Sequence, residues 1–91
     1  NRSMSLIMID IDNFKAINDR FGHLFGDKVI RRVADAIRGT VRHDDVVGRY
    51  GGEEFIVVLS NTPRDVAKDV AEKIRRTVED LHFDENAKIT V

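Results

Sequence analysis

The stretch Arg49-Tyr50-Gly51-Gly52-Glu53-Glu54-Phe55 separates two apolar segments, residues 46–47 and 55–59. Two adjacent glycines at such a position are typical of a two-residue turn between antiparallel strands, because that turn requires the positive φ that glycine adopts easily. We therefore predict a β-hairpin with Glu53 and Glu54 at its tip. Taken alone, the turn favours two solvated glutamates. Two neighbouring carboxylates beside a bare backbone also suit a divalent cation that carries a phosphate.

The composition is that of one small globular domain: 91 residues, of which 42% are hydrophobic and 34% are charged. A net charge of −1 argues against broad binding to nucleic acid or to an anionic membrane. The absence of cysteine excludes a disulfide framework and a thiolate zinc site. No apolar run approaches the ~20 residues that cross a bilayer. We expect a cytoplasmic domain without membrane contact; a membrane anchor of a longer protein would lie outside these residues.

Further elements follow from the hydrophobic pattern on either side of the hairpin. Residues 5–9 are almost continuously apolar, as in a strand that is covered on both faces. Apolar residues recur with helical spacing in three segments, which begin after Asp12, Gly26 and Thr62. A last strand is expected to begin near Ala87. The predicted order is β-α-α-β-β-α-β.

This order predicts an α+β fold of the ferredoxin-like or palm type, in which helices pack on an antiparallel sheet and one helix is additional. The first strand is then central and lies next to the second strand of the hairpin. Asp10, at the end of the first strand, is therefore expected to lie beside Glu53.

Asp10 is a candidate partner of the hairpin glutamates in a metal site. A charged aspartate at the end of a buried strand is costly unless it is solvated, paired or bound to a cation. Asp12, next to the helix start, is interpreted as a helix cap. Asp10 and Glu53 with the carbonyl of Ile11 would form an all-oxygen site for magnesium or manganese, as in two-metal nucleotidyl transfer. The sequence has no GxxxxGK loop followed by Ser or Thr, which disfavours a P-loop NTPase.

Three groups of residues, in this order, resemble the GGDEF family of diguanylate cyclases. They are Asp10-Ile11-Asp12-Asn13-Phe14-Lys15-Ala16-Ile17-Asn18-Asp19, then Phe21-Gly22-His23 with Gly26-Asp27, then Arg49-Tyr50-Gly51-Gly52-Glu53-Glu54-Phe55. The resemblance implies that two GTP molecules are joined into cyclic di-GMP with release of pyrophosphate. It also implies that residues 1–91 are one GGDEF-type catalytic domain in its GGEEF variant. We expect a truncated domain that lacks the family's N-terminal helix and the C-terminal part.

The resemblance implies the following roles at the metal site. Asp10 and Glu53 would be side-chain ligands of two Mg²⁺ (or Mn²⁺) ions per active site, and Ile11 would add its backbone carbonyl. Glu53 would also assist deprotonation of the attacking 3′-hydroxyl. Glu54 would add negative charge.

The resemblance also assigns the nucleotide contacts. Backbone N–H groups of Phe14 and Gly52 would bind phosphate, and Lys15 would neutralise charge that develops there. Asn18 and Asp27 would read guanine, and His23 would line the same site. A carboxylate suits guanine, which offers a paired N1–H and exocyclic amine that adenine lacks. Without the resemblance, ordinary roles are favoured: Asn18 on a helix surface, Asp27 as an N-cap, His23 in a loop and Lys15 in solvent.

Arg42-His43-Asp44-Asp45 lies just before the hairpin and matches the RxxD site through which many family members bind their own product. Arg42 would grip phosphate or guanine, and Asp45 would accept from guanine. On its own, such a pattern favours a surface salt bridge. In register with the signature, it predicts product inhibition.

The expected partners are GTP, cyclic di-GMP and a second copy of the chain. Each site would hold one of the two nucleotides, so two protomers must face each other. The alternative is an inactive GGDEF-type domain that binds GTP or cyclic di-GMP as an effector.

Overall fold

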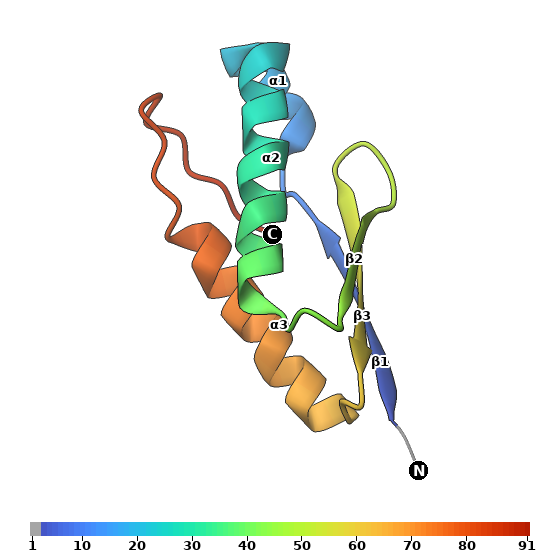
Figure 1. Cartoon of the computed structure of the whole chain (residues 1–91). Coiled ribbons are helices and arrows are strands. Elements are labelled where there is room, and N and C mark those ends of the chain that lie inside the picture. Colours follow the sequence, from blue (N-terminus) through green and yellow to red (C-terminus); the bar gives the residue numbers. More distant parts are fainter. Residues whose placement is uncertain (1–2) are drawn as a thin grey trace.

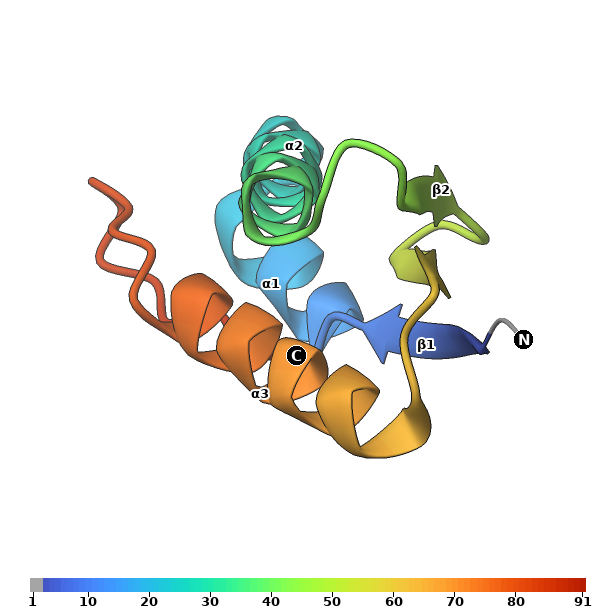
Figure 2. The same cartoon turned by 60° about the horizontal axis from the view of Figure 1, so that its bottom comes forward.

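The computed structural model describes residues 3–91, which form three strands and three helices. The elements are β1 (Met4–Asp10), α1 (Phe14–Phe21), α2 (His23–Thr40), β2 (Val46–Arg49), β3 (Glu54–Ser60) and α3 (Arg64–Glu79). Figures 1 and 2 show the helices gathered on one side of the sheet. The predicted α+β class is confirmed. No helix among the described residues is long and apolar enough to cross a bilayer.

The sheet is antiparallel throughout and has the order β1-β3-β2. The predicted neighbourhood of β1 and the second hairpin strand is therefore confirmed, with Asp10 opposite Glu54. The predicted central position of β1 is wrong for the described residues, where β3 is central and β1 lies at an edge.

The expected last strand near Ala87 does not form within the described residues. The segment that contains Thr90 makes one backbone contact with the first strand's end, from the Asp12 N–H to the Thr90 carbonyl at 2.9 Å. A single hydrogen bond is not a ladder, and strand pairing depends on a series of such bonds. The segment still contributes to the core, because Ile89 is buried.

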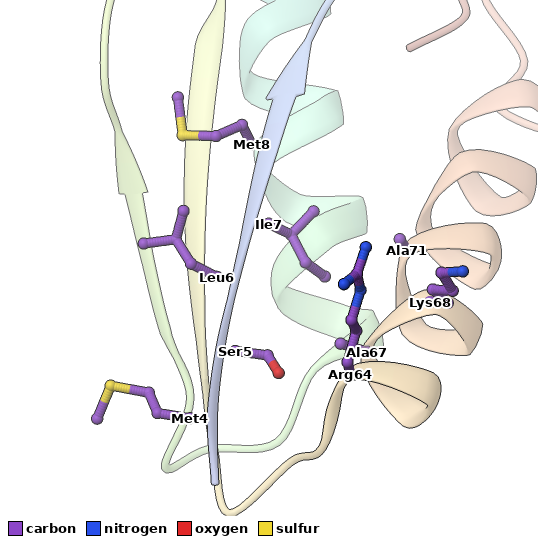
Figure 3. Close-up of a pocket in the computed structure, with 9 residues that line it drawn as sticks. All are labelled: Met4, Ser5, Leu6, Ile7, Met8, Arg64, Ala67, Lys68 and Ala71. Carbon is purple, nitrogen blue, oxygen red and sulfur yellow. The ribbon is translucent and has the colours of Figure 1, made fainter.

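The two faces of the sheet differ in the side chains that they bury. On the helix side, β3 buries alternate residues Phe55, Val57 and Leu59, as the period of a half-buried strand requires. The helices complete this core with three sets of buried residues: Ile17 from α1, Val29, Val33 and Ile37 from α2, and Ile74 and Val78 from α3. Met4, Leu6 and Met8 point away from the helices and are exposed (Figure 3).

The helix starts differ from those predicted. Asp12 does not cap α1: Asn13 precedes it in a left-handed conformation, and the Asp12 carboxylate instead accepts a hydrogen bond from the Thr90 hydroxyl at 2.8 Å. The second helix begins at His23 and not after Gly26 as predicted. Gly22, with a φ of 92°, ends the first helix and redirects the chain there. This start places Asp27 inside α2, so it is not an N-cap.

Candidate active site

The backbones of the acidic residues predicted to form the metal site are neighbours where β1 ends and β3 begins. Asp10 is the cross-strand partner of Glu54, and the Ile11 N–H donates to the Glu53 carbonyl at 3.1 Å. Like charges directly opposite each other destabilise a sheet. Within residues 3–91, no lysine or arginine forms an ion pair with Asp10, Glu53 or Glu54. The arrangement therefore leaves an uncompensated negative charge at one end of the sheet.

The donor set fits a hard divalent cation. Its candidate ligands are the carboxylate oxygens of Asp10 and Glu53 and the backbone carbonyl of Ile11. Mg²⁺ and Mn²⁺ prefer such oxygen ligands. The described part of the chain contains no cluster of three or more histidine, cysteine, aspartate or glutamate side chains with metal-binding geometry. Mg²⁺ sites in proteins usually include water and phosphate oxygens beside one or two carboxylates.

The hairpin connection is longer than the predicted two-residue turn. It comprises residues 50–53 and is closed by the Tyr50 N–H, which donates to the Glu54 carbonyl at 2.7 Å. Among the glycines of the described residues only Gly22 has a positive φ, so the predicted conformation of Gly51 and Gly52 is wrong. A longer loop distributes the reversal over four residues and does not need the mirror-image turn.

The two hairpin glycines instead leave space. A Cβ on Gly51 would collide with the Oε1 atom of Glu54, so glycine there makes room for that carboxylate. A Cβ on Gly52 would meet nothing within 4 Å. The Gly52 backbone is exposed and open to an anion of the size of a phosphate.

The start of α1 supplies free backbone donors. The first intrahelical hydrogen bond runs from the Ile17 N–H to the Asn13 carbonyl at 3.0 Å. The N–H groups of the first turn, including that of Phe14, therefore have no acceptor within the helix. The positive end of the helix dipole adds to their attraction for anions. Lys15 is exposed in the same turn.

Asn18 has a buried side-chain oxygen without a partner. Its Oδ1 atom is the one buried side-chain N or O atom of the described residues that lacks a hydrogen bond. Such atoms are rare in folded proteins. A Cβ at Gly26 of α2 would overlap with this Oδ1 and lie 3.3 Å from the Phe14 ring. Gly26 thus leaves the room that the Asn18 side chain needs between α1 and α2.

The other two predicted nucleotide residues lie on α2 near Asn18. Asp27 follows Gly26 directly, and its carboxylate is exposed. His23 is the first residue of α2 and is also exposed. The turn at Gly22 therefore brings His23 and Asp27 to the same end of the helix pair as Asn18.

Arg42 and Asp45 form a hydrogen-bonded unit far from the carboxylates. The Asp45 carboxylate accepts from the Arg42 N–H at 2.9 Å and from the Ser60 N–H at 3.0 Å. The Arg42 Nη2 donates to the Ser60 carbonyl at 2.6 Å and to the Thr62 hydroxyl at 3.0 Å. Ser60 ends β3 whereas Glu54 begins it, so this unit lies about 20 Å from the metal candidates at ~3.3 Å per residue.

A second charged cluster lies on α3, where the basic residues suggest a solvated helix face rather than a secondary contact for the product. Arg75 donates to Glu72 at 2.7 and 2.9 Å, and Arg76 donates to it at 3.0 Å. The hydrogen bonds from Arg75 are the main reason why the pKa of Glu72 falls to about 2. The cluster is solvent-exposed, so it forms a charged helix surface.

A groove runs between β1 and α3, as Figure 3 shows. Its lining residues are Met4, Ser5, Leu6, Ile7, Met8, Arg64, Ala67, Lys68 and Ala71. None of the predicted site residues belongs to this set. The groove is therefore distinct from the candidate active site.

Together, the antiparallel sheet, the helices on one face and the carboxylates at adjoining strand ends define a ferredoxin-like, palm-type α+β core. The family described as "Diguanylate cyclase, GGDEF domain" matches residues 1–91. The chain belongs to the GGDEF family.

Two curated relatives show how the family's members are named. Diguanylate cyclase A of Treponema denticola is 53% identical over 86% of this chain and 21% of its own length. The cyclic di-GMP phosphodiesterase PdeR of Escherichia coli is 43% identical over 81% of this chain and 11% of its own length. The chain thus spans about a fifth or less of these relatives.

Solved structures resemble the chain over almost all of its length. The active GGEEF domain of a diguanylate cyclase from Vibrio cholerae superposes with a TM-score of 0.92 at 43% identity, covering 98% of this chain and 58% of that one. The GGDEF domain of DgcB from Caulobacter crescentus, solved in complex with cyclic di-GMP, gives a TM-score of 0.87 at 35% identity, covering 96% of this chain and 54% of that one.

Proposed function

We propose that residues 1–91 form part of the catalytic domain of a diguanylate cyclase, which converts two GTP into cyclic di-GMP and two pyrophosphates. The observation that carries this proposal is the register of β1 and β3, which gathers Asp10, Glu53 and Glu54 at one end of the sheet. GTP is available in the cytoplasm, where we place this segment.

Asp10 and Glu53, with the Ile11 carbonyl, would hold two Mg²⁺ or Mn²⁺ ions. When bound, these ions polarise the attacking hydroxyl and stabilise the negative charge on the phosphates. Glu53 accepts the proton of the 3′-hydroxyl, whose oxygen then bonds to the α-phosphorus of the other GTP as pyrophosphate leaves. Glu54 increases the negative charge that retains the cations.

The start of α1 and the hairpin would bind the triphosphate between them. The N–H groups of Phe14 and Gly52 donate to phosphate oxygens, and Lys15 balances the charge that develops during transfer. Asn18 contacts guanine through its side-chain amide, which can both donate and accept. Asp27 accepts from guanine N1–H and the exocyclic amine, and His23 lines the base.

Removal of the guanine contacts is expected to weaken GTP use selectively. Asn18→Ala or Asp27→Asn should raise the KM for GTP about 10- to 100-fold and reduce preference for GTP over ATP, because donors of guanine would lose their acceptors. Steady-state rates with both nucleotides measure this. Asp84→Asn, in the exposed segment after α3, is the control. An unchanged nucleotide preference in both variants contradicts the assignment.

The reaction requires two copies of this site, because one protomer holds one nucleotide and each 3′-hydroxyl must reach the opposite α-phosphate. We therefore propose that the active form is a homodimer. The specific rate should rise with protein concentration until dimers predominate. Sedimentation of the chain with GTP and Mg²⁺ tests the state directly, and turnover by a monomer would contradict it.

Arg42 and Asp45 are proposed as a product-inhibition site. The Arg42 side chain is 60% exposed; its Nη2 donates within the protein and its Nε lies 3.7 Å from the Asp45 carboxylate. The Nη1 group of the fork remains for phosphate or guanine. Arg42→Ala should raise the cyclic di-GMP concentration that halves the rate by at least about 10-fold. Arg31→Ala, which removes an exposed arginine of α2 that does not line the pocket around Arg42 and Asp45, is the control. Inhibition as strong as in the parent would contradict the regulatory assignment.

The second candidate is a non-catalytic domain that binds GTP or cyclic di-GMP as an effector. The similarity to a relative named as a phosphodiesterase favours this possibility. Incubation of the dimeric protein with GTP and Mg²⁺, followed by mass analysis, distinguishes the two. Formation of cyclic di-GMP supports the cyclase; nucleotide binding without turnover supports the effector.

A further inference from the structure

Arg49, the last residue of β2, is bonded to the glycine loop that follows it. Its Nε donates to the Gly51 carbonyl at 3.1 Å and to the Gly52 carbonyl at 3.2 Å. Its Nη2 donates to the Gly52 carbonyl at 2.7 Å. Within residues 3–91 neither carbonyl receives a backbone N–H, and Arg49 forms no ion pair. The guanidinium therefore acts on the loop backbone.

These contacts set the direction of two peptide units. In a trans peptide the C=O and the following N–H point in opposite directions, and the described residues contain no cis peptide. Holding the Gly51 carbonyl therefore turns the Gly52 N–H away from Arg49. Holding the Gly52 carbonyl turns the Glu53 N–H away in the same manner.

Glu53 is consequently held at both of its peptide bonds. Arg49 fixes the unit before it, and the Ile11 N–H fixes the unit after it through the Glu53 carbonyl at 3.1 Å. The loop needs such restraint, because two consecutive glycines are the most flexible backbone that a chain offers. Charge-assisted bonds to the carbonyls also polarise the peptide units and strengthen their N–H donors.

We propose that Arg49 is a positioning residue, which orients the Gly52 N–H toward phosphate and the Glu53 carboxylate toward metal and 3′-hydroxyl. This inference rests on the proposed function. Lysine cannot replace it, because an ammonium is a point charge without the planar fork that spans two carbonyls.

The kinetic test compares Arg49→Ala and Arg49→Lys with Arg38→Ala, an exposed arginine on α2. Arg49→Ala should lower kcat about 100-fold and Arg49→Lys about 10-fold, with smaller changes in the KM for GTP, because misplacement by about 1 Å penalises the transition state most. Added guanidinium ion should restore part of the rate of Arg49→Ala, whereas methylammonium should not. A kcat within about twofold of the parent in Arg49→Ala overturns the proposal.

Backbone relaxation without nucleotide supplies a second readout that is independent of turnover. The order parameters of the Gly52 and Glu53 amides should fall from about 0.85 to below about 0.6 in Arg49→Ala and remain unchanged in Arg38→Ala. Unchanged values in Arg49→Ala overturn the positioning role even where the rate falls, since Arg49 would then act on the nucleotide directly. If the parent makes no cyclic di-GMP, the proposed function fails. Amides that become mobile in Arg49→Ala would then show that Arg49 only orders the loop, and its role in the reaction would be overturned.

Discussion

Glu53→Gln is expected to abolish cyclic di-GMP formation, lowering kcat by about 10³-fold or more. Glutamine has nearly the same shape but is neutral, so it cannot take the proton of the 3′-hydroxyl and is a weaker metal ligand. The fold should survive, because the tertiary contact of this residue is made by its backbone carbonyl with the Ile11 N–H. Product formation from GTP and Mg²⁺, quantified by mass spectrometry, measures the effect.

Glu53→Asp is the matched control, because it keeps a carboxylate at the same position. We expect it to retain at least about a tenth of the parent rate, since a shorter side chain shifts the carboxylate without removing its charge. Thermal denaturation of both variants checks that the sheet is intact. Glu53→Gln with more than a tenth of the parent rate would rule out Glu53 as the base.

Asp45→Ala is expected to destabilise the protein by about 2–4 kcal/mol. The Asp45 side chain is 2% exposed and accepts backbone N–H groups from both Arg42 and Ser60. Removal of the carboxylate leaves these donors unpaired and frees the loop between α2 and β2 from the end of β3. Urea denaturation, followed by circular dichroism, measures the free energy of unfolding.

Asp44→Ala is the control for this stability effect, because Asp44 is exposed and contributes its backbone carbonyl to the Ser60 hydroxyl. It should change the free energy of unfolding by less than about 0.5 kcal/mol. A loss below about 1 kcal/mol in Asp45→Ala would show that this carboxylate is not a structural support. The Asp45→Ala effect on product inhibition can be interpreted only after this measurement.

The sequence predicted the neighbourhood of Asp10 and the hairpin glutamates correctly, because the order of elements permits few antiparallel topologies. It mispredicted the turn itself. Two glycines indicated positive φ values, yet the loop has four residues and neither glycine adopts one. Propensity describes what glycine permits, whereas the Arg49 side chain and the Glu54 carbonyl determine the conformation that forms.

The predicted last strand shows a similar limit. Apolar residues near Ala87 suit a strand, but a strand forms only where a partner provides a continuous ladder, and here a single bond joins Asp12 to Thr90. Helix starts were mispredicted for a related reason. Asp12 has the chemistry of a cap, yet its carboxylate is engaged by a residue 78 positions away.

Local signals in the chain were sufficient for the α+β class, the hairpin and the residue types of the site, because alternation, helical spacing and acid placement are properties of short segments. Two features depend on contacts between distant segments. One is the buried, unpartnered oxygen of Asn18 against Gly26. The other is the hydrogen bond from the Ser60 N–H to the Asp45 carboxylate. Desolvation and hydrogen-bond partnership exist only after the elements pack, so no local pattern encodes them.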